Sequence, residues 1–443
     1  MKFKRIKCAV LAATLAVSSL FVATADVEAA MKGTWKQDSK GYWFSTSQGQ
    51  GNGYAKNEWV DGYWLDSKGY WTYKAKASWR KNANGWWYGD TSGWYAKNQW
   101  QTIDGVKYYF DGKGYMVANA FAKGNKFDKN GKKVDSGYKW LTVGGKKKYG
   151  KSSKLYVKGV QTIDGVKYYF NTNGVLITSA YSNGYKMNKN GKIVDSGYKW
   201  IKGTGSHSST FRYGKSNANY IKGWANIDGA DYYFDADGWM LRWTVRKIGG
   251  KIYAFKATGQ LGVYTEVTAG TGEISSEVTF NVNDSNRKKA AEDMETFLVL
   301  ATKEGSKKTV TVDGVKKTVV NSGGFIWVDD ETLVDYVSKT TTTKTVVEGT
   351  GTAAKLFDAL RMSNLGAGET YNYSFRIGNS KYTKLNVAQS TMSFTVDKKS
   401  YSAYYDETSK KVYILGNVSS TNFLKSLQSA GAVSKVTTKK STR

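Results

Sequence analysis

The stretch WQTIDGVKYYF at residues 100–110 decides the fold, because it returns as VQTIDGVKYYF at residues 160–170 with a single change. Repetition of this kind has to be explained before any single residue is interpreted. The chain has no proline and 48 glycines, so its turns depend on Gly, Asn and Asp. In both copies Asp-Gly separates two short runs of aromatic and β-branched residues, a pattern that predicts a β-hairpin.

A unit of about 20 residues extends this pattern over the first half of the chain. Successive start positions are 24, 20, 21, 21, 19, 20, 21, 19, 24 and 19 residues apart, at Trp35, Trp59, Trp79, Trp100, Phe121, Trp140, Val160, Tyr181, Trp200, Trp224 and Trp243. A single hairpin is marginally stable in water, so the hairpins are expected to stack on one another. The predicted fold class is mainly β, with a β-hairpin solenoid at residues 31–264 and a separate α+β domain at residues 265–443.

A closer similarity at a distance of 60 residues joins positions that are three units apart. Besides the opening stretch, VDSGYKW occurs at residues 134–140 and again at residues 194–200. Two explanations fit this spacing equally well. Either about three hairpins complete one turn of the solenoid, or a block of three units has been duplicated.

Tryptophan and charge divide the chain at the same place. Of the 16 Trp residues, 15 lie between Trp35 and Trp243, and residues 31–264 carry a net charge of +23 against +5 for residues 265–443. A strongly basic module attracts polyanions, and outside a Gram-positive cell the abundant ones are phosphate-bearing wall polymers. Nucleic acid is not an expected partner, because secretion removes most contact with it.

The first 29 residues have the layout of a secretory signal peptide, with basic residues, an apolar run at 9–23 and small residues before cleavage at Ala25 or Ala29. The apolar run is shorter than the roughly 20 residues of a spanning helix, so no transmembrane segment is expected after signal removal. The only cysteine, Cys8, lies in this segment, so no disulfide is expected in the mature chain. We expect an extracellular protein, secreted and associated with the cell wall.

Units such as SWRKNANGWWYGDTSG (78–93) and WYAKNQWQTIDGVKYYFDGKGYM (94–116) resemble the choline-binding or cell-wall-binding repeats of Gram-positive surface proteins. They are also similar to repeats of glucan-binding glucosyltransferases and of clostridial toxin receptor-binding regions. The resemblance covers about residues 33–264. In choline-binding members it implies an aromatic cage made by the Trp that opens a hairpin, a second Trp seven residues on and a ring of the next hairpin. Such a cage holds a quaternary ammonium group by the negative faces of its rings.

The ligand-binding residues that the resemblance implies concentrate in the N-terminal units. Trp79 and Trp86 have the cage spacing, and the full set is Trp35, Tyr42, Trp59, Trp64, Trp79, Trp86, Trp94, Trp100, Tyr108 and Tyr109. In later units Lys107, Lys167 or Asp231 stands in place of the second ring, a departure that resembles the glucan and toxin repeats more closely. Most rings are expected to form the core between hairpins, while clustered Trp residues expose faces that suit sugars as well as cations.

The second half of the chain mixes helix and strand patterns and resembles no family that we recognise. A helix is predicted at residues 283–305 with Asp284 or Ser285 as its cap, and shorter helices are predicted at 330–338, 352–362 and 420–430. The buried face of the helix at residues 283–305 is predicted to consist of Ala290, Met294, Phe297, Leu298 and Ala301. Residues 308–320 predict a hairpin, and strands are predicted at 371–377, 390–396 and 410–416.

The available residue types limit the catalysis that the chain can perform. The only histidine, His207, lies in the repeat region and is interpreted as incidental, so Ser-His-Asp and His-ligated zinc sites are excluded from the second half. A carboxylate pair could support glycoside cleavage, but Asp329, Asp330 and Glu331 are explained more simply as an acidic helix start. We expect no catalytic residue, no metal and no cofactor.

The sequence therefore favours a secreted, non-catalytic protein that docks on a wall polymer and presents an α+β interaction domain. Its polymer would be a choline-bearing or other teichoic acid, or a glucan. Two alternatives stay open: a wall-modifying glycoside hydrolase or transglycosylase that the repeats target, and an adhesin or toxin-like binder of host glycans. The oligomeric state stays open as well.

Overall fold

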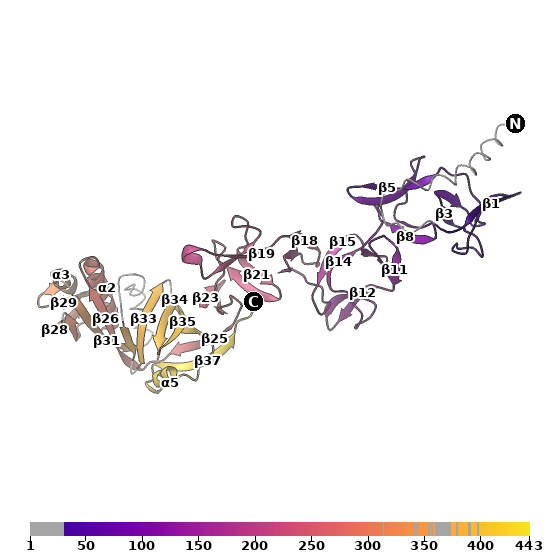
Figure 1. Ribbon diagram of the computed structural model, residues 1–443. Coiled ribbons are helices and arrows are strands. Elements are labelled where there is room, and N and C mark those ends of the chain that lie inside the picture. Colours follow the sequence, from indigo (N-terminus) through magenta and orange to yellow (C-terminus); the bar gives the residue numbers. More distant parts are fainter. Residues whose placement is uncertain are drawn as a thin grey trace. The chain divides into compact units, whose positions relative to one another are not determined.

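The computed structural model describes residues 31–443 except 313, 341–342, 353–354, 356–357, 359–373, 378–379, 389–390 and 397. The signal segment predicted at residues 1–29, with Cys8, lies outside these residues. The described chain is mainly β and divides into two compact units, Met1–Ser196 and Gly197–Arg443. Each unit is described separately below (Figure 1).

The first unit consists of short antiparallel hairpins that follow one another along the chain. In order, their strands are β1 (Thr34–Asp38), β2 (Gly41–Ser45), β3 (Glu58–Val60), β4 (Tyr63–Leu65), β5 (Ala77–Asn82), β6 (Gly85–Asp90), β7 (Gln99–Ile103), β8 (Val106–Phe110), β9 (Ala120–Ala122), β10 (Asn125–Phe127), β11 (Lys133–Ser136), β12 (Lys139–Val143), β13 (Lys146–Gly150), β14 (Gly159–Ile163), β15 (Val166–Phe170), β16 (Ala180–Ser182), β17 (Tyr185–Met187) and β18 (Ile193–Ser196). The predicted hairpins at both copies of the opening stretch are therefore confirmed.

The Asp-Gly pairs form tight two-residue turns. Asp104 and Gly105 have φ of 48° and 82°, and Ile103 pairs with Val106 directly across the turn. The second copy repeats this geometry, with φ of 48° and 80° at Asp164 and Gly165. Two successive positive φ angles match the right-handed twist of the flanking strands, which is why Asp-Gly recurs here.

The same turns also join alternate hairpins. Trp59 of β3 pairs in parallel with Ile103 of β7, and Asp104 Oδ1 accepts a hydrogen bond of 2.9 Å from the amide of Asp61. In the next block Phe121 of β9 pairs with Ile163 of β14, and Asp164 Oδ1 accepts a 3.0 Å bond from the Lys123 amide. The 60-residue similarity thus corresponds to a recurring contact, and the aspartates do more than form turns. Whether the hairpins make a solenoid with three per turn stays a prediction.

The second unit begins with three further hairpins, formed by β19 (Lys199–Lys202), β20 (Phe211–Gly214), β21 (Gly223–Ile227), β22 (Ala230–Phe234), β23 (Thr244–Ile248) and β24 (Lys251–Phe255). The last hairpin corrects one predicted start position. Trp243 precedes β23 with φ of 46°, and the register of Val245 against Ala254 gives the start position to Val245 instead. Val245 is fully buried, so a valine takes the place of the ring in this hairpin.

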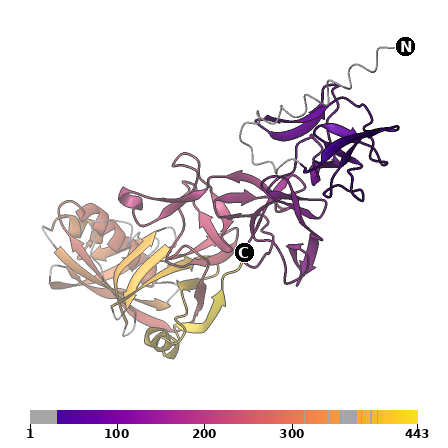
Figure 2. The same ribbon diagram turned by 45° about the vertical axis from the view of Figure 1, so that its right-hand side comes forward.

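A large sheet and its helices complete the second unit. Its strands are β25 (Val263–Ala269), β26 (Glu273–Val282), β27 (Lys307–Val312), β28 (Val315–Ser322), β29 (Phe325–Val328), β30 (Glu331–Thr332), β31 (Thr343–Thr352), β32 (Ser374–Ile377), β33 (Ser380–Ala388), β34 (Thr391–Val396), β35 (Lys399–Asp406), β36 (Lys411–Leu415) and β37 (Val433–Lys440). Their order is β30-β29-β28-β27-β31-β26-β32-β33-β34-β35-β36-β25-β37. In both ribbon views α2 (Arg287–Ala301) and α3 (Leu333–Ser338) lie near one end of the sheet, and α5 (Asn422–Ser429) lies by β37 (Figures 1 and 2).

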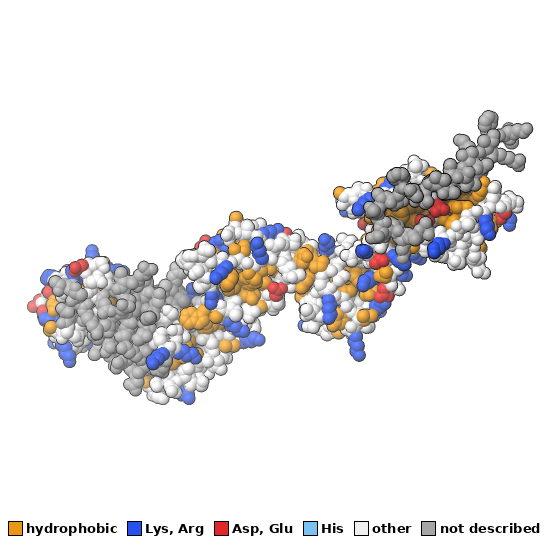
Figure 3. Space-filling view, viewed as in Figure 1, with side chains coloured by type: hydrophobic (Ala, Val, Ile, Leu, Met, Phe, Trp, Pro, Cys, Tyr) orange, Lys and Arg blue, Asp and Glu red, His pale blue; other side chains and the backbone are white. Residues whose placement is uncertain are grey.

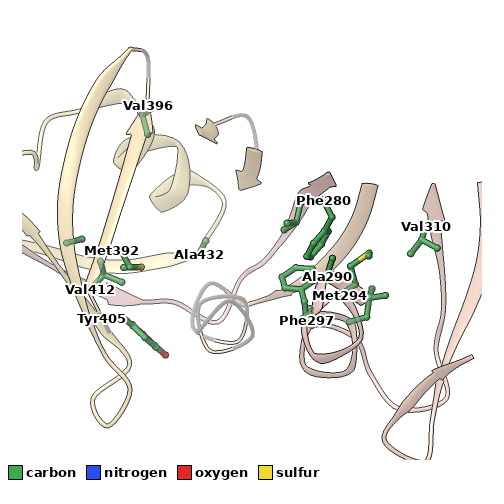
Figure 4. Packing of buried hydrophobic residues seen from close by; sticks show 14 of the residues in the cluster. Phe280, Ala290, Met294, Phe297, Val310, Met392, Val396, Tyr405, Val412 and Ala432 are labelled. Carbon is green, nitrogen blue, oxygen red and sulfur yellow. The ribbon is translucent and has the colours of Figure 1, made fainter. Parts of the chain in front are cut away.

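The core of the sheet region forms between α2 and the strands beside it. The five residues predicted for the helix face, Ala290, Met294, Phe297, Leu298 and Ala301, are all fully buried. Figure 4 shows Phe280 of β26 close to Ala290 and Phe297 of the helix. Burying a side chain of this size contributes about 1.5–3 kcal/mol, so the helix face anchors this end of the sheet.

Most elements predicted for the second half are confirmed, but two details are wrong: the cap of α2 and the acidic helix start at Asp329–Glu331. The cap of α2 is Asn286, because the helix begins later than predicted and Asn283 and Ser285 form a polar turn before it. The helix predicted at 352–362 lies largely outside the described residues. Val245 and Ala254 pack with Tyr264 and Tyr413, so the last hairpin and the sheet share a compact unit. The domain boundary predicted after residue 264 stays a prediction.

Candidate functional site: the aromatic surfaces of the repeats

Start-position rings pack on the second strand of the following hairpin. Trp79 lies 5.0 Å from Tyr108 and 5.8 Å from Phe110, measured between ring centroids. The same arrangement recurs at Trp140 with Tyr168 and Phe170, and in the second unit at Trp200 with Tyr232 and Phe234. The YYF motif therefore supplies the rings that receive the preceding Trp, and the expectation that most rings form the core between hairpins agrees with this packing.

The predicted cage around Trp79 is only partly assembled. Tyr108 contacts Trp79 but is 3% exposed, and Tyr109 packs instead on Trp100 and Phe127. Among the described residues no ring contact joins Trp86 to Trp79, because Trp86 pairs across the strands with Lys81, whose Nζ lies 5.2 Å from its ring centroid. The residue spacing implied two ring partners for Trp79, and the structure brings only Tyr108 into contact with it. Ligand binding by these rings stays a prediction.

Trp59, Trp64 and Trp94 form one packed group. Trp59 is 3% exposed, stacks on Trp94 at 5.1 Å and lies 5.3 Å from Trp64. Its indole nitrogen donates a 3.0 Å hydrogen bond to Gln101 Oε1. Trp59 is thus a core residue, whereas Trp64 and Trp94 are half-buried.

The first hairpins contain a ring cluster that the sequence reasoning missed. Trp71 lies 4.3 Å from Tyr73, 5.2 Å from Tyr63 and 6.3 Å from Tyr42. Tyr73 is 63% exposed, so one side of this cluster faces solvent. Tyr42 therefore joins this cluster, while the predicted Trp35 contacts Tyr63 and the buried Phe44. The motif YWTY at 70–73 indicates a ring cluster in the sequence, but it was missed because its rings do not occupy the start positions of the repeat.

Side-chain cations of the protein cover several of the half-buried rings. Between 4.9 and 5.4 Å separate each cation from its ring centroid in the pairs Lys36–Trp43, Lys74–Trp64, Arg80–Trp87, Lys81–Trp86 and Lys107–Trp100. Figure 3 shows Lys and Arg side chains beside hydrophobic ones over the visible surface of both units. Each contact is worth about 0.5–1 kcal/mol at an exposed site. A cationic ligand would have to displace these groups, whereas an anion would be attracted by them.

Two carboxyl groups in the first unit have raised pKa values. Glu58 is fully buried and accepts a bond from the Gln50 amide, while its Oε2 has no partner among the described residues. Burial raises the pKa of Glu58, and it raises the pKa of Asp104 to about 6 despite the bond from the Asp61 amide. Both groups lie where β3 and β7 pair. A change in their protonation therefore affects the stability of this pairing rather than a reaction.

The acidic cluster of the second half is explained by local structure. Asp329 and Asp330 have φ of 47° and 68° and form the turn between β29 and β30, rather than a helix start. Asp329 pairs with Lys317 at 2.6 Å, and Glu331 pairs with Lys339. Within the described part of the chain, no group of three His, Cys, Asp or Glu residues is placed to hold a metal. No described helix is long and apolar enough to cross a membrane.

Comparison with known proteins identifies the repeats. Residues 98–116, 161–176 and 222–240 match the family model of a putative cell wall binding repeat. Glucosyltransferase-S of Streptococcus mutans serotype c is 29% identical over 226 residues, which is 48% of this chain and 14% of that protein. The chain thus carries cell wall binding repeats and spans a small part of the length of this curated relative.

Three solved structures contain chains with partial similarity to this one. The modular autolysin LytC of Streptococcus pneumoniae is 22% identical and shares 54% of this chain and 51% of its own, with a TM-score of 0.14. The choline-binding domain of CbpL from Streptococcus pneumoniae is 20% identical, with 52% of this chain and 97% of its own covered and a TM-score of 0.16. An alternansucrase in complex with isomaltononaose is 18% identical, with 65% and 22% covered and a TM-score of 0.16.

Proposed function

We propose that residues 31–264 dock the protein on a cell-wall polymer, as a secreted protein that presents the sheet region of its second half at the wall. The observation that carries the proposal is the position of the three cell wall binding repeats. Each match overlaps a hairpin with the YYF motif: β7–β8, β14–β15 and β21–β22. The repeats therefore recur with the structural block, as expected of a module that contacts a repeating polymer.

The charge of the module supports an anionic polymer. Residues 31–264 carry a net charge of +23, and the ring faces described above are covered by lysine and arginine rather than left open for a quaternary ammonium group. Teichoic acid without choline fits these surfaces better than a choline-bearing one, because its phosphates are attracted by the covering cations.

A glucan is the second candidate ligand, and the similarity to glucosyltransferase-S favours it. Exposed rings such as Tyr73 suit the flat apolar face of a sugar as well as they suit a cation. Binding to a glucan needs no phosphate and depends weakly on salt, whereas binding to a polyanion weakens steeply as salt rises.

Sedimentation with purified Gram-positive walls tests the proposal on the full chain. We expect the protein to sediment with intact walls, to be released by salt, and to stay in solution with walls from which the phosphate polymers have been stripped. Sedimentation that choline competes away would support the choline cage, and retention on dextran would support the glucan. A protein that binds neither walls nor dextran would overturn the docking proposal, and a clearing band in a zymogram of the same walls would favour the enzyme alternative.

A further inference from the structure

The hairpins β5–β6, β12–β13 and β19–β20 share a feature that the YYF hairpins lack. Each has a Tyr-Gly pair in its second strand, at Tyr88-Gly89, Tyr149-Gly150 and Tyr213-Gly214. A Cβ on Gly150 would lie 2.3 Å from the carbonyl oxygen of Leu155, so the glycine lets the following loop fold back onto the strand. We call these the Tyr-Gly hairpins.

The loop of each Tyr-Gly hairpin carries a tyrosine in a fixed position. In the first unit Tyr156 lies against Gly174 of the next hairpin, where a Cβ would be 2.0 Å from the ring. The backbone bond from Val157 N to Tyr149 O, at 2.9 Å, holds the loop in place. One face of the ring is thereby fixed against the protein backbone.

Two lysines lie at the ring of Tyr156. Lys148 Nζ is 3.7 Å from the ring centroid and Lys158 Nζ is 5.8 Å from it, so the two ammonium groups are at most about 9.5 Å apart by the sum of these distances. Within the described part of the chain neither lysine forms an ion pair with a carboxylate. Lys148 is half-buried, unlike its exposed neighbours Lys146 and Lys147.

The second unit has an equivalent arrangement 64 residues further along the sequence. Tyr220 lies against Gly238, where a Cβ would be 2.1 Å from the ring. Arg212 Cζ is 4.2 Å from the Tyr220 centroid and 4.0 Å from that of Trp239, and Lys222 Nζ is 5.7 Å from Tyr220. Arg212 is oriented by bonds to the carbonyl oxygens of Asp237 and Asn217, and forms no ion pair with a described carboxylate.

The Tyr-Gly hairpin nearest the N-terminus lacks the cation at this position. There Trp87 takes the place of Lys148 and Arg212, and its ring lies 6.1 Å from Tyr95. The framework of tyrosine and glycine is thus constant among the three hairpins, while the residue against the tyrosine changes from an aromatic ring to a cation. The exchange of a ring for a cation beside a constant tyrosine points to an anionic ligand in the two later hairpins.

We propose that Lys148, Tyr156 and Lys158 in the first unit, and Arg212, Tyr220 and Lys222 in the second, are two sites for phosphodiester groups of the wall polymer. Two cations on one ring supply charge-assisted hydrogen bonds to phosphate oxygens, and the tyrosine fixes their position. The proposal assigns the phosphate-binding part of the proposed docking function. This proposal rests on the proposed docking function only in naming the wall polymer as the natural source of the phosphate groups.

Isothermal titration of the full chain with a synthetic glycerol phosphate trimer at low salt tests the two sites. We expect two trimers to bind per chain, one after the double substitution Lys148→Ala with Lys158→Ala, and none when Arg212→Ala and Lys222→Ala are added. The matched control is Lys146→Ala with Lys147→Ala, which removes the same charge from the strand that carries Lys148 and should leave two. Lys158→Ala alone, at an exposed position, should weaken one site about tenfold while preserving the fold.

Each outcome is decisive for the sites. Equal losses in the control and in the Lys148 and Lys158 variant would show attraction by net charge alone and overturn the proposal, as would binding of an unphosphorylated glycerol trimer. Failure of the sites is distinguishable from failure of docking: a chain that sediments with walls but ignores the trimer loses the sites and keeps the docking function.

Discussion

Gly174→Ala should destabilise the first unit far more than the same substitution at Gly165, although both glycines have a left-handed backbone with φ of +68° and +80°. Placing an L-residue in this conformation costs about 1–2 kcal/mol at either position. At Gly174 the new Cβ would also lie 2.0 Å from the Tyr156 ring, whereas nothing lies within 4 Å at Gly165. Carbon atoms in contact are about 3.5–4.0 Å apart, so the ring has to move.

Displacing the ring adds about 1–3 kcal/mol of overpacking to the backbone cost. We therefore expect a loss of about 2–5 kcal/mol for Gly174→Ala and about 1–2 kcal/mol for Gly165→Ala. Urea unfolding of the full chain, followed by the fluorescence of the Trp residues of the repeats, measures both losses. Equal losses at the two positions would refute the reasoning, because they would show that the Tyr156 ring is not held against Gly174.

Two further predictions concern the first unit. Trp79→Ala should lower the free energy of unfolding by about 2–4 kcal/mol in the same assay, because its ring contacts Tyr108 and Phe110. Trp86→Ala, which loses one cation contact, should lower it by under about 1 kcal/mol. The reverse order would contradict the assignment of Trp79 to the core. Because the pKa of Asp104 is raised to about 6, its contribution to stability is present below about pH 4 and lost as the pH rises through about 6. The unfolding free energy should therefore fall by up to about 3 kcal/mol between pH 4 and pH 7, and Asp104→Asn should remove most of this slope; an unchanged slope would assign the effect elsewhere.

The hairpins were predictable from the sequence because their signals are local. An Asp-Gly pair between aromatic runs dictates positive φ at two neighbouring residues, and this geometry is the same at Asp104 and Asp164. Helix α2 was predictable for a similar reason, since its buried face follows the helical period. Its cap was not, because Asp284, Ser285 and Asn286 are all residue types that favour the N-cap position and their order in the sequence does not choose among them.

The candidate site was harder to predict because it depends on contacts between hairpins. A spacing of seven residues places Trp79 and Trp86 on opposite strands of one hairpin, but it does not show that Trp79 reaches Tyr108 or that Lys81 covers Trp86. The cluster around Trp71 was missed for the same reason, as its partners come from the hairpins of Tyr42 and Tyr63 and from Tyr73, which lies outside the strands. Ring contacts of this kind are set by how successive units pack, and they leave only a weak trace in residue spacing.

Comparing the repeats with one another separates structure from binding where a single copy cannot. Asp104 and Asp164 keep both the turn and the bond to the hairpin two units before, so the two copies of the opening stretch serve the same structural purpose. The Tyr-Gly hairpins keep their glycines and their loop tyrosine, yet exchange Trp87 for Lys148 and Arg212 on the tyrosine. This variation within a constant framework motivates the proposal that phosphate groups bind at Lys148 and Arg212 of the Tyr-Gly hairpins rather than at the YYF strands.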